Sequence, residues 1–294
     1  TIRKHTEYNI QEQSQLKEKW LMIQVNDLTF SYPGNKHRVF EGLTLQLSES
    51  RIYGLLGKNG MGKSTLLYLI AGLLKPKKGS ILIDGLTASR RYPQMLQELY
   101  LVPEEYDLPD MTLASYTRIH EDFYPRFSRE TLKKCLADFE MPTEVDMKQL
   151  SMGQKKKVYM SFALATGCRI ILMDEPTNGL DIPSKALFRQ VVAGNMTEGS
   201  SLVISTHQVH DVEQLLDHIL ILDNSRILLN AATEQITSDY TFSIRQPAEM
   251  DDTVLYAEPS MQGNATIARR KEGDSETPIN LELLFNAVTS GKLK

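Results

Sequence analysis

Apolar runs of strand length recur along the chain, separated by turns or by longer stretches with helical spacing. Most of these runs are continuous, which is typical of strands buried on both faces of a parallel sheet. The continuous runs occupy residues 21–25, 28–30, 52–56, 80–84, 100–103, 169–174 and 201–206. Residues 43–47 instead alternate between apolar and polar side chains, which predicts a strand with one exposed face. Strands and helical stretches therefore alternate, and we expect an α/β fold.

Helical spacing fills the longer intervals between these runs. The segments with this spacing are residues 66–73, 112–124, 128–140 and 151–166. In the third of them, Leu132, Leu136 and Phe139 recur at intervals of four and three, which forms one apolar face. Because helical segments dominate the middle of the chain and interrupt the strands, we expect a helical subdomain over about residues 87–160.

The two ends of the chain differ from its middle. Residues 1–20 are polar and irregular, and we expect an N-terminal extension there. Two apolar runs joined by a polar turn at residues 219–229 predict an antiparallel hairpin. Short strand-like pieces then alternate with polar turns until a final amphipathic helix at about residues 280–288. We therefore expect a main domain over residues 21–232 and a small α+β accessory domain over residues 233–294.

Composition and charge narrow the class of protein. The 294 residues are 41% hydrophobic and 24% charged, as in ordinary globular proteins, and the net charge is -4. This balance gives no reason to expect a nucleic-acid partner. No apolar run approaches the roughly 20 residues that span a bilayer, so we expect any membrane partner to be a separate chain. Cys135 and Cys168 lie far apart in no metal-like spacing, and we expect both to be packing residues in a reducing compartment.

A glycine-rich motif follows the apolar run at residues 52–56. Residues 57–65 fit the phosphate-loop pattern G-x-x-x-x-G-K-[ST] and lie between a predicted strand and a predicted helix. Glycine lets backbone N–H groups approach phosphate oxygens, and the positive end of the helix dipole points at the anion. The predicted nucleotide-binding residues of this loop are Gly57, Lys58, Asn59, Gly60, Met61, Gly62, Lys63, Ser64 and Thr65. Lys63 is expected to reach the β- and γ-phosphates, and Ser64 to bind Mg²⁺.

Two further strands end in residues that suit phosphate chemistry. In open α/β sheets, ligands bind at the C-terminal ends of the strands. One run ends in Asp174 and Glu175, and another is followed by His207. Asp174 is the expected Mg²⁺ partner of a phosphate loop, whereas Glu175 could polarise the attacking water as a general base. His207 could contact the γ-phosphate and orient that water. We therefore predict Lys63, Glu175 and His207 as catalytic residues, with ATP and Mg²⁺ as cofactors.

Together with residues 150–154, these features resemble the ATP-binding subunits of ABC transporters over about residues 21–230. Residues 150–154 read Leu-Ser-Met-Gly-Gln and are similar to the family's LSGGQ signature, while Asp181 ends a segment that is similar to its D-loop. Tyr32 is similar to the tyrosine that stacks on the adenine ring. The resemblance implies a P-loop NTPase fold with a RecA-like core, an antiparallel β layer and a helical subdomain.

The resemblance also implies an assembly. The expected unit is a homodimer, or a heterodimer with a second ATP-binding subunit, in which each signature faces the ATP bound by the partner. The signature residues are Ser151, Met152, Gly153 and Gln154. Ser151 and Gln154 also have the spacing of a capping box, so this helix N-terminus is a second surface that favours an anion.

Two positions depart from the family pattern. Met152 replaces the first glycine of the signature, but Gly153 is kept, and we expect function to survive. The family's Q-loop glutamine corresponds to Glu104, or one residue on to Glu105. A carboxylate accepts hydrogen bonds but cannot donate one, so Glu104 could bind Mg²⁺ yet slow hydrolysis.

These features predict an ATP-hydrolysing subunit that dimerises on ATP and powers a separate membrane permease. We expect a cytoplasmic protein bound at the inner face of the cell membrane, without a nucleic-acid partner. Within the family, residues 122–127 and the short C-terminal region are similar to subunits that serve bacterial exporters of drugs or lantibiotics. The alternatives are an ABC-type ATPase that acts on DNA or ribosomes, and a weakly hydrolysing, nucleotide-dependent regulator, which Glu104 suggests.

Overall fold

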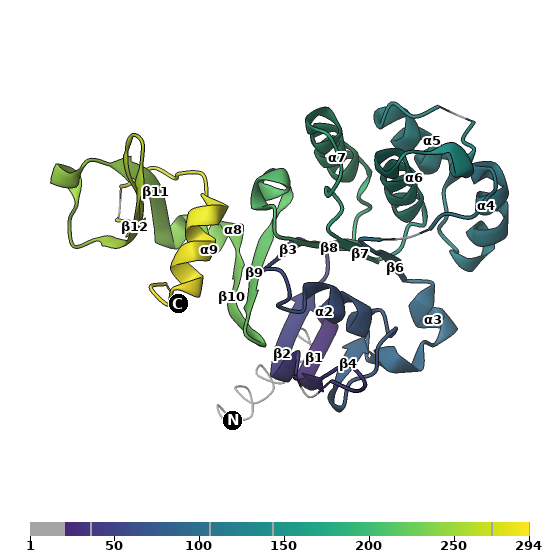
Figure 1. Ribbon diagram of the computed structural model, residues 1–294, viewed down its shortest axis with the longest axis horizontal. Helices are drawn as coiled ribbons and strands as arrows, with labels where there is room; N and C mark the ends of the chain where they lie inside the picture. Colours follow the sequence, from purple (N-terminus) through teal and green to yellow (C-terminus); the bar gives the residue numbers. More distant parts are fainter. Residues whose placement is uncertain (1–20, 36, 106, 143, 272, 294) are drawn as a thin grey trace, which may run out of the picture.

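A six-stranded sheet runs through the middle of the molecule in the order β10-β9-β3-β8-β7-β6 (Figure 1). Its strands are β3 (Ile52–Leu56), β6 (Leu99–Val102), β7 (Ile170–Asp174), β8 (Ser201–Thr206), β9 (His218–Asp223) and β10 (Arg226–Ala232). All but β10 are parallel, and β10 closes the predicted antiparallel hairpin with β9. The strands β7 and β8 are buried along their whole length, as their continuous apolar runs predict. The C-terminal ends of β3, β7 and β8 therefore meet at one edge of the sheet.

This computed structural model describes residues 21–35, 37–105, 107–142, 144–271 and 273–293. The N-terminal extension that we expect at residues 1–20 lies outside the described residues.

A second, antiparallel sheet has the order β2-β1-β4-β5. Its strands are β1 (Leu21–Phe30), β2 (Phe40–Ser48), β4 (Lys78–Ile83) and β5 (Leu86–Thr87). Buried and exposed positions alternate along most of β2, which confirms the predicted half-exposed strand. The two apolar runs at residues 21–30 form a single strand, because a shift in register near Asp27 absorbs the polar interruption.

Helix α2 (Lys63–Ile70) lies between the two sheets (Figure 1). It contacts β4 of the antiparallel sheet and β7 and β8 of the parallel one. Leu66, Leu67, Leu69 and Ile70 are almost completely buried in a core shared with β1, β2 and β4. The predicted apolar helix after the glycine-rich loop is confirmed, and its burial on two sides fixes its N-terminus beneath that loop.

The other face of the parallel sheet carries the helices of the middle region. They are α4 (Leu113–His120), α5 (Arg129–Asp138), α6 (Met152–Ala165) and α7 (Ile182–Asn195). The short helix α3 (Pro93–Leu96) lies instead on the side of α2, where Met95 and Leu96 join the core shared with the antiparallel sheet (Figure 1). The helices expected over residues 112–124, 128–140 and 151–166 correspond to α4, α5 and α6. We predicted neither α3 nor α7; α3 is a single turn, and α7 buries only Ser184, Phe188, Val191 and Val192. A stripe of apolar residues that narrow is easily overlooked in the sequence.

The C-terminal part of the chain forms a three-stranded antiparallel sheet in the order β11-β13-β12. Its elements are α8 (Thr233–Asp239), β11 (Tyr240–Arg245), β12 (Val254–Ser260), β13 (Gly263–Arg269) and α9 (Leu281–Thr289). The three strands and the final helix match the expected pieces, whereas α8 was not predicted. Helix α9 contacts β9 and β10 as well as β13, so the end of the chain packs against the central sheet.

Short 3-10 turns connect several of these elements. They are η1 (Ala88–Arg90), η2 (Glu121–Phe123), η3 (Met147–Gln149), η4 (Val209–Asp211), η5 (Glu213–Leu215) and η6 (Pro247–Glu249). Cys135 and Cys168 are both free and buried, as predicted, and burial raises the pKa of each thiol to about 12. Within the described ranges, no helix has the length and apolar character needed to cross a membrane.

Candidate functional site

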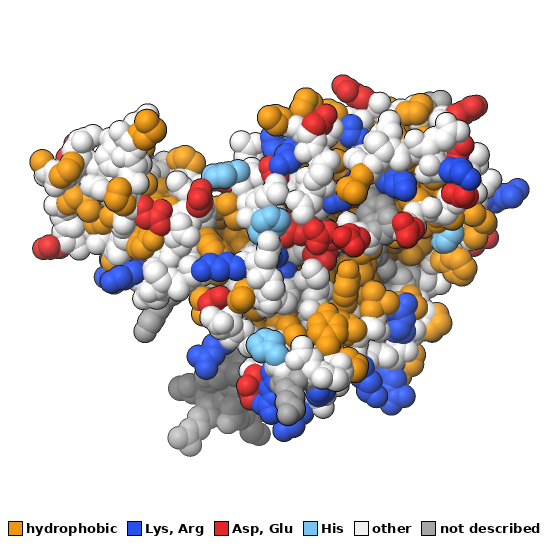
Figure 2. Space-filling view, viewed as in Figure 1, with side chains coloured by type: hydrophobic (Ala, Val, Ile, Leu, Met, Phe, Trp, Pro, Cys, Tyr) orange, Lys and Arg blue, Asp and Glu red, His pale blue; other side chains and the backbone are white. Residues whose placement is uncertain are grey.

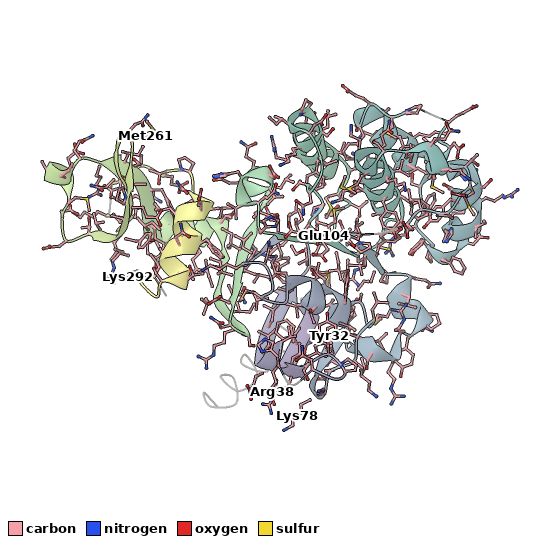
Figure 3. The ribbon with its side chains drawn as sticks, viewed as in Figure 1. Tyr32, Arg38, Lys78, Glu104, Met261 and Lys292 are labelled. Carbon is pink, nitrogen blue, oxygen red and sulfur yellow. The ribbon has the colours of Figure 1, made fainter. Side chains whose placement is uncertain are left out.

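A cavity of about 570 Å³ opens where β3, β7 and β8 end. Its lining comprises Tyr32, Val39, Asn59, Gly60, Gly62, Lys63, Ser64, Thr65, Glu104, Glu175, Asn178 and His207. Most of the residues predicted from the glycine-rich loop and the strand ends therefore come together in one place. In Figure 3, Glu104 lies at the level of the parallel sheet and Tyr32 beside the antiparallel one.

The glycine-rich loop is held in the conformation that its glycines permit. Gly60 and Gly62 have φ values of 81° and 96°, and Gly62 is the N-cap of α2. The ammonium of Lys63 is 6% exposed and donates hydrogen bonds to the carbonyls of Gly57, at 2.8 Å, and Lys58, at 3.4 Å. A buried cation thus lies over the loop, beside the free N–H groups of a helix N-terminus, which is an arrangement suited to an anion.

Asp174 lies beneath this loop with only 1% of its surface exposed. The hydroxyl of Ser205 donates a hydrogen bond to Oδ1, whereas Oδ2 has no partner among the described residues. Burial raises the pKa of Asp174 above its ordinary value, although the nearby hydroxyls of Ser205 and Ser64 oppose this shift. A buried carboxylate oxygen without a partner calls for a further ligand, and a cation would supply it.

The donor set around Asp174 fits Mg²⁺ better than a metal held by the protein alone. Among the described residues, no three His, Cys, Asp or Glu side chains converge as a metal site. Mg²⁺ in nucleotide sites needs only one or two carboxylates, because substrate phosphates and water complete its shell. The Ser64 hydroxyl and the carboxylates of Asp174 and Glu104 are hard oxygen ligands of this kind.

The side chain of Glu175 receives hydrogen bonds from the segment that follows β8. Thr206 Oγ1 donates to Oε2 at 3.0 Å, and His207 Nδ1 lies 2.8 Å from Oε1. The ammonium of Lys63 lies 3.6 Å from the same Oε1. The predicted histidine and lysine therefore both contact the predicted base, and Glu175 is oriented by three side chains.

The backbone of Glu175 is also unusual, with a positive φ of 45° in a non-glycine residue. This left-handed conformation costs about 1–2 kcal/mol, so neighbouring groups must hold it. Its N–H donates to the carbonyl of Ser205 at 2.9 Å, and its carbonyl accepts from Lys156 Nζ at 2.9 Å. Lys156 is 4% exposed; burial lowers the pKa of its ammonium, against the opposing charges of Glu104, Glu175 and Asp174.

Tyr32 lies across the cavity from the acids. Its hydroxyl is 3.0 Å from Thr65 Oγ1, and its ring packs edge-on against Phe30 with the centroids 5.1 Å apart. The side chain remains 39% exposed. An exposed ring that is fixed at its edge and at its hydroxyl presents a face on which a base could stack.

Glu104, rather than Glu105, belongs to this cavity. One of its oxygens accepts a hydrogen bond of 2.9 Å from Asn178 Nδ2. Figure 2 shows acidic side chains gathered at the centre of this face, where Figure 3 places Glu104. Glu105 lines a neighbouring cavity of about 640 Å³, which Glu104 borders as well.

The signature segment lies beside this second cavity instead of inside the first. The capping box is confirmed: Gln154 N donates to Ser151 Oγ at 3.3 Å, and Ser151 N donates to Gln154 Oε1 at 3.0 Å. Met152 is 72% exposed and lies next to Gly179. Asp181 is the N-cap of α7, where its side chain accepts from the backbone N–H of Ser184 at 3.0 Å.

Three residues that bond to side chains or backbone of the site were not predicted from the sequence. Lys156 sits in a run of three lysines that reads as a solvated face, and only the fold shows that it is buried. Asn178 lies three residues before Asp181, in the segment that is similar to the D-loop. Gln208 follows His207 directly, so its position beside the predicted histidine was the available signal.

Comparison with known proteins agrees with this geometry. Residues 40–178 match the family model described as ABC transporter. The chain is 26% identical over 292 residues to the ABC transporter ATP-binding protein YtrB of Bacillus subtilis, covering 92% of this chain and 99% of that protein. It is 31% identical over 228 residues to the cobalt import ATP-binding protein CbiO of Salmonella paratyphi A, covering 73% and 82%.

A solved structure of the ATP-binding subunit of an ABC transporter superimposes on the chain with a TM-score of 0.65. The two are 26% identical, and the match covers 73% of this chain and 91% of that one. The predicted P-loop NTPase fold and the ATPase activity are therefore confirmed at the level of the family. The chain belongs to the ABC transporter family, as an ATP-binding ATPase subunit.

Proposed function

We propose that this protein binds and hydrolyses ATP to drive a separate membrane permease, and that it dimerises when ATP binds. The observation that carries the proposal is the convergence of Lys63, Glu175 and His207 over the buried Asp174. A cation, a base with an orienting partner, and a carboxylate with an unpartnered oxygen are the parts that phosphoryl transfer to water requires.

Binding of ATP would use the glycine-rich loop and its flanks. The N–H groups of the loop and Lys63 would hold the β- and γ-phosphates, and the exposed ring of Tyr32 would stack on adenine. In this structure Lys63 bonds to loop carbonyls and faces Glu175, and these contacts would be exchanged for phosphate oxygens. Ser64 and Asp174, with Glu104, would hold Mg²⁺, which supplies positive charge to the phosphate oxygens.

Hydrolysis would use the residues at the ends of β7 and β8. Glu175 would accept a proton from the attacking water, because its carboxylate is already oriented by Thr206 and His207. The other ring nitrogen of His207 would contact the γ-phosphate. Lys156 would act indirectly, since its bond to the Glu175 carbonyl holds the left-handed backbone that aims the side chain.

Dimerisation would place Ser151, Gly153 and Gln154 of one subunit against the ATP of the other. The exposure of two large apolar side chains, Met152 at 72% and Ile182 at 84%, favours a protein contact on this face. The partner would be a second copy or a second ATP-binding subunit. We further propose a peripheral position at the inner face of the cell membrane, against permease subunits. The relatives include a Nod factor export protein and a cobalt import protein, so the proposal specifies no direction of transport.

The decisive experiment compares ATP hydrolysis by the purified protein with that of Lys63→Ala and Glu175→Gln. Both variants are expected to lose at least about 99% of turnover, because each removes a charged group from the reacting phosphate or water. Lys133→Ala, which truncates an exposed lysine of α5, is the matched control and should be unaffected. Hydrolysis at the wild-type rate in both site variants would overturn the proposed mechanism. Glu175→Gln with ATP should also sediment as a dimer.

A second candidate function rests on Glu104. Its carboxylate lies near Asp174 and Lys156, and the negative charge it adds favours slow hydrolysis over rapid turnover. The protein would then act as a nucleotide-dependent regulator. Single-turnover hydrolysis by Glu104→Gln distinguishes the two: a rate well above the wild type supports the regulator, and an equal or lower rate supports the transport ATPase.

A further inference from the structure

A chain of three side-chain hydrogen bonds ends on Glu104. Asn178 Nδ2 donates to Glu104 Oε1 at 2.9 Å, and Gln208 Nε2 donates to Asn178 Oδ1 at 3.0 Å. Lys185 Nζ donates to Gln208 Oε1 at 3.0 Å and also pairs with Asp211 at 2.7 Å. The four linked side chains come from four segments: those that follow β6, β7 and β8, and helix α7.

The charged ends give this chain a single direction. An ammonium can only donate and a carboxylate can only accept, so each amide must accept from the Lys185 side and donate toward Glu104. Turning either amide over would break two bonds and place like groups together. The bonds at the two ends involve a charged group and are therefore the stronger ones. The orientation of Glu104 thus depends on Asn178 and Gln208 together.

The same segment also orients the predicted base. Gln208 N donates to Thr206 Oγ1 at 3.0 Å, and Thr206 in turn donates to Glu175. Gln208 therefore stands between two acids of the site, and is linked to Glu175 through Thr206 and to Glu104 through Asn178. A movement of this segment would turn both carboxylates at once.

We propose that Asn178 and Gln208 are positioning residues for ATP hydrolysis, which keep Glu104 turned toward the nucleotide and tie it to the segment of His207. The inference rests on the proposed function, because Glu104 matters to hydrolysis only if the cavity holds ATP. If Asn178 only held two loops together, its substitution would change the stability of the protein. If it positions Glu104, the effect on kcat must depend on whether positions 104 and 178 can still form a hydrogen bond.

The test reverses the hydrogen bond between positions 104 and 178. Asn178→Asp removes the donor and sets a second carboxylate against Glu104, and kcat should fall about tenfold to a hundredfold.

The double variant Glu104→Gln/Asn178→Asp supplies the rescue. The amide at position 104 can donate to the carboxylate at position 178, which can still accept from Gln208. Its kcat should lie within about threefold of Glu104→Gln alone, because the hydrogen bond is restored with its direction reversed. Asn195→Asp is the matched control, because Asn195 donates to the Val191 carbonyl on α7, outside this chain of bonds. The kcat of this control should equal that of the wild type.

Gln208→Glu is the second variant in case Asn178→Asp does not fold. It removes the donor to Asn178 but leaves an acceptor for Lys185, and a loss of kcat in the same range is expected. If wild-type protein hydrolyses ATP while Asn178→Asp is unaffected, or while the double variant stays as slow as Asn178→Asp, the inference is wrong and the proposed function stands. If the wild type itself hydrolyses no ATP, the proposed function fails and this inference fails with it.

Discussion

Two glycines of the phosphate loop allow the packing of that loop to be measured. Gly60 and Gly62 both have left-handed backbones, with φ values of 81° and 96°. A methyl group at Gly60 would meet no atom within 4 Å. At Gly62 the same group would lie 2.7 Å from Val39 Cγ1 and 2.9 Å from Phe40 Cζ. The ring of Phe40 is fully buried and cannot move aside.

The expected cost of each alanine follows from these contacts. A left-handed alanine costs about 1–2 kcal/mol, and the reduced freedom of the unfolded chain returns about 0.4–1 kcal/mol. Gly60→Ala should therefore destabilise by about 0–1.6 kcal/mol. Gly62→Ala carries the same backbone cost. Overpacking against Phe40 adds about 1–3 kcal/mol to it. The difference between the two variants isolates the packing of the loop against β2.

The assay is urea unfolding of both variants without nucleotide, followed by circular dichroism, with thermal melts alongside. Gly62→Ala should be less stable than Gly60→Ala by about 1–3 kcal/mol, which corresponds to a melting temperature lower by about 2–12 °C. Equal stabilities, or a less stable Gly60→Ala, would show that the loop is not packed against Phe40 as described.

Three further predictions concern individual side chains. Lys156→Met should lower kcat at least about tenfold, and unchanged turnover would contradict this. Its free energy of unfolding should change by less than about 1 kcal/mol, because the variant loses the bond to Glu175 but no longer buries an ammonium. Burial lowers the pKa of His218, so the unfolded state binds the proton first and stability should decline as the pH falls below about 6.5. His218→Gln can still donate to Asn230 and should flatten that decline, whereas equal slopes would exclude the assignment. Tyr32→Ala should weaken ATP binding about tenfold in calorimetry and Tyr32→Phe hardly at all, since base–aromatic stacking contributes about 1–3 kcal/mol.

The parts of the fold that the sequence predicted well are those with a strong hydrophobic signal. The continuous runs of β3, β7 and β8 and the glycine-rich loop between β3 and α2 were all placed within a residue or two. Helix α7 was missed, although Phe188, Val191 and Val192 recur at helical spacing and are completely buried. Its N-cap, Asp181, also ends a segment that is similar to the D-loop, and the helix begins directly after that segment.

The sequence predicted most of the residues that face the cavity directly. It did not predict the residues that contact these through the backbone or through another side chain. Glu175 and His207 follow strand ends, where the topology of an α/β sheet places ligands, and Lys63 begins the helix after the phosphate loop; both Lys63 and His207 contact Glu175. The burial of Lys156 and the bonds of Asn178 depend on how segments far apart in the sequence pack together. No local pattern encodes such contacts, so only the fold could show them.

The order of strands in the central sheet has a consequence for synthesis of the chain. The strand β3, which precedes the phosphate loop, pairs with β8 and β9. Ile52 pairs with Leu202, which is synthesised about 150 residues later. At about 5–20 residues per second, ribosomes need roughly 8–30 s to cover that distance. Throughout this interval both edges of an apolar strand are without their native neighbours and open to wrong pairing. We therefore expect the yield of folded protein to depend on chaperones and on growth temperature more than its final stability would suggest.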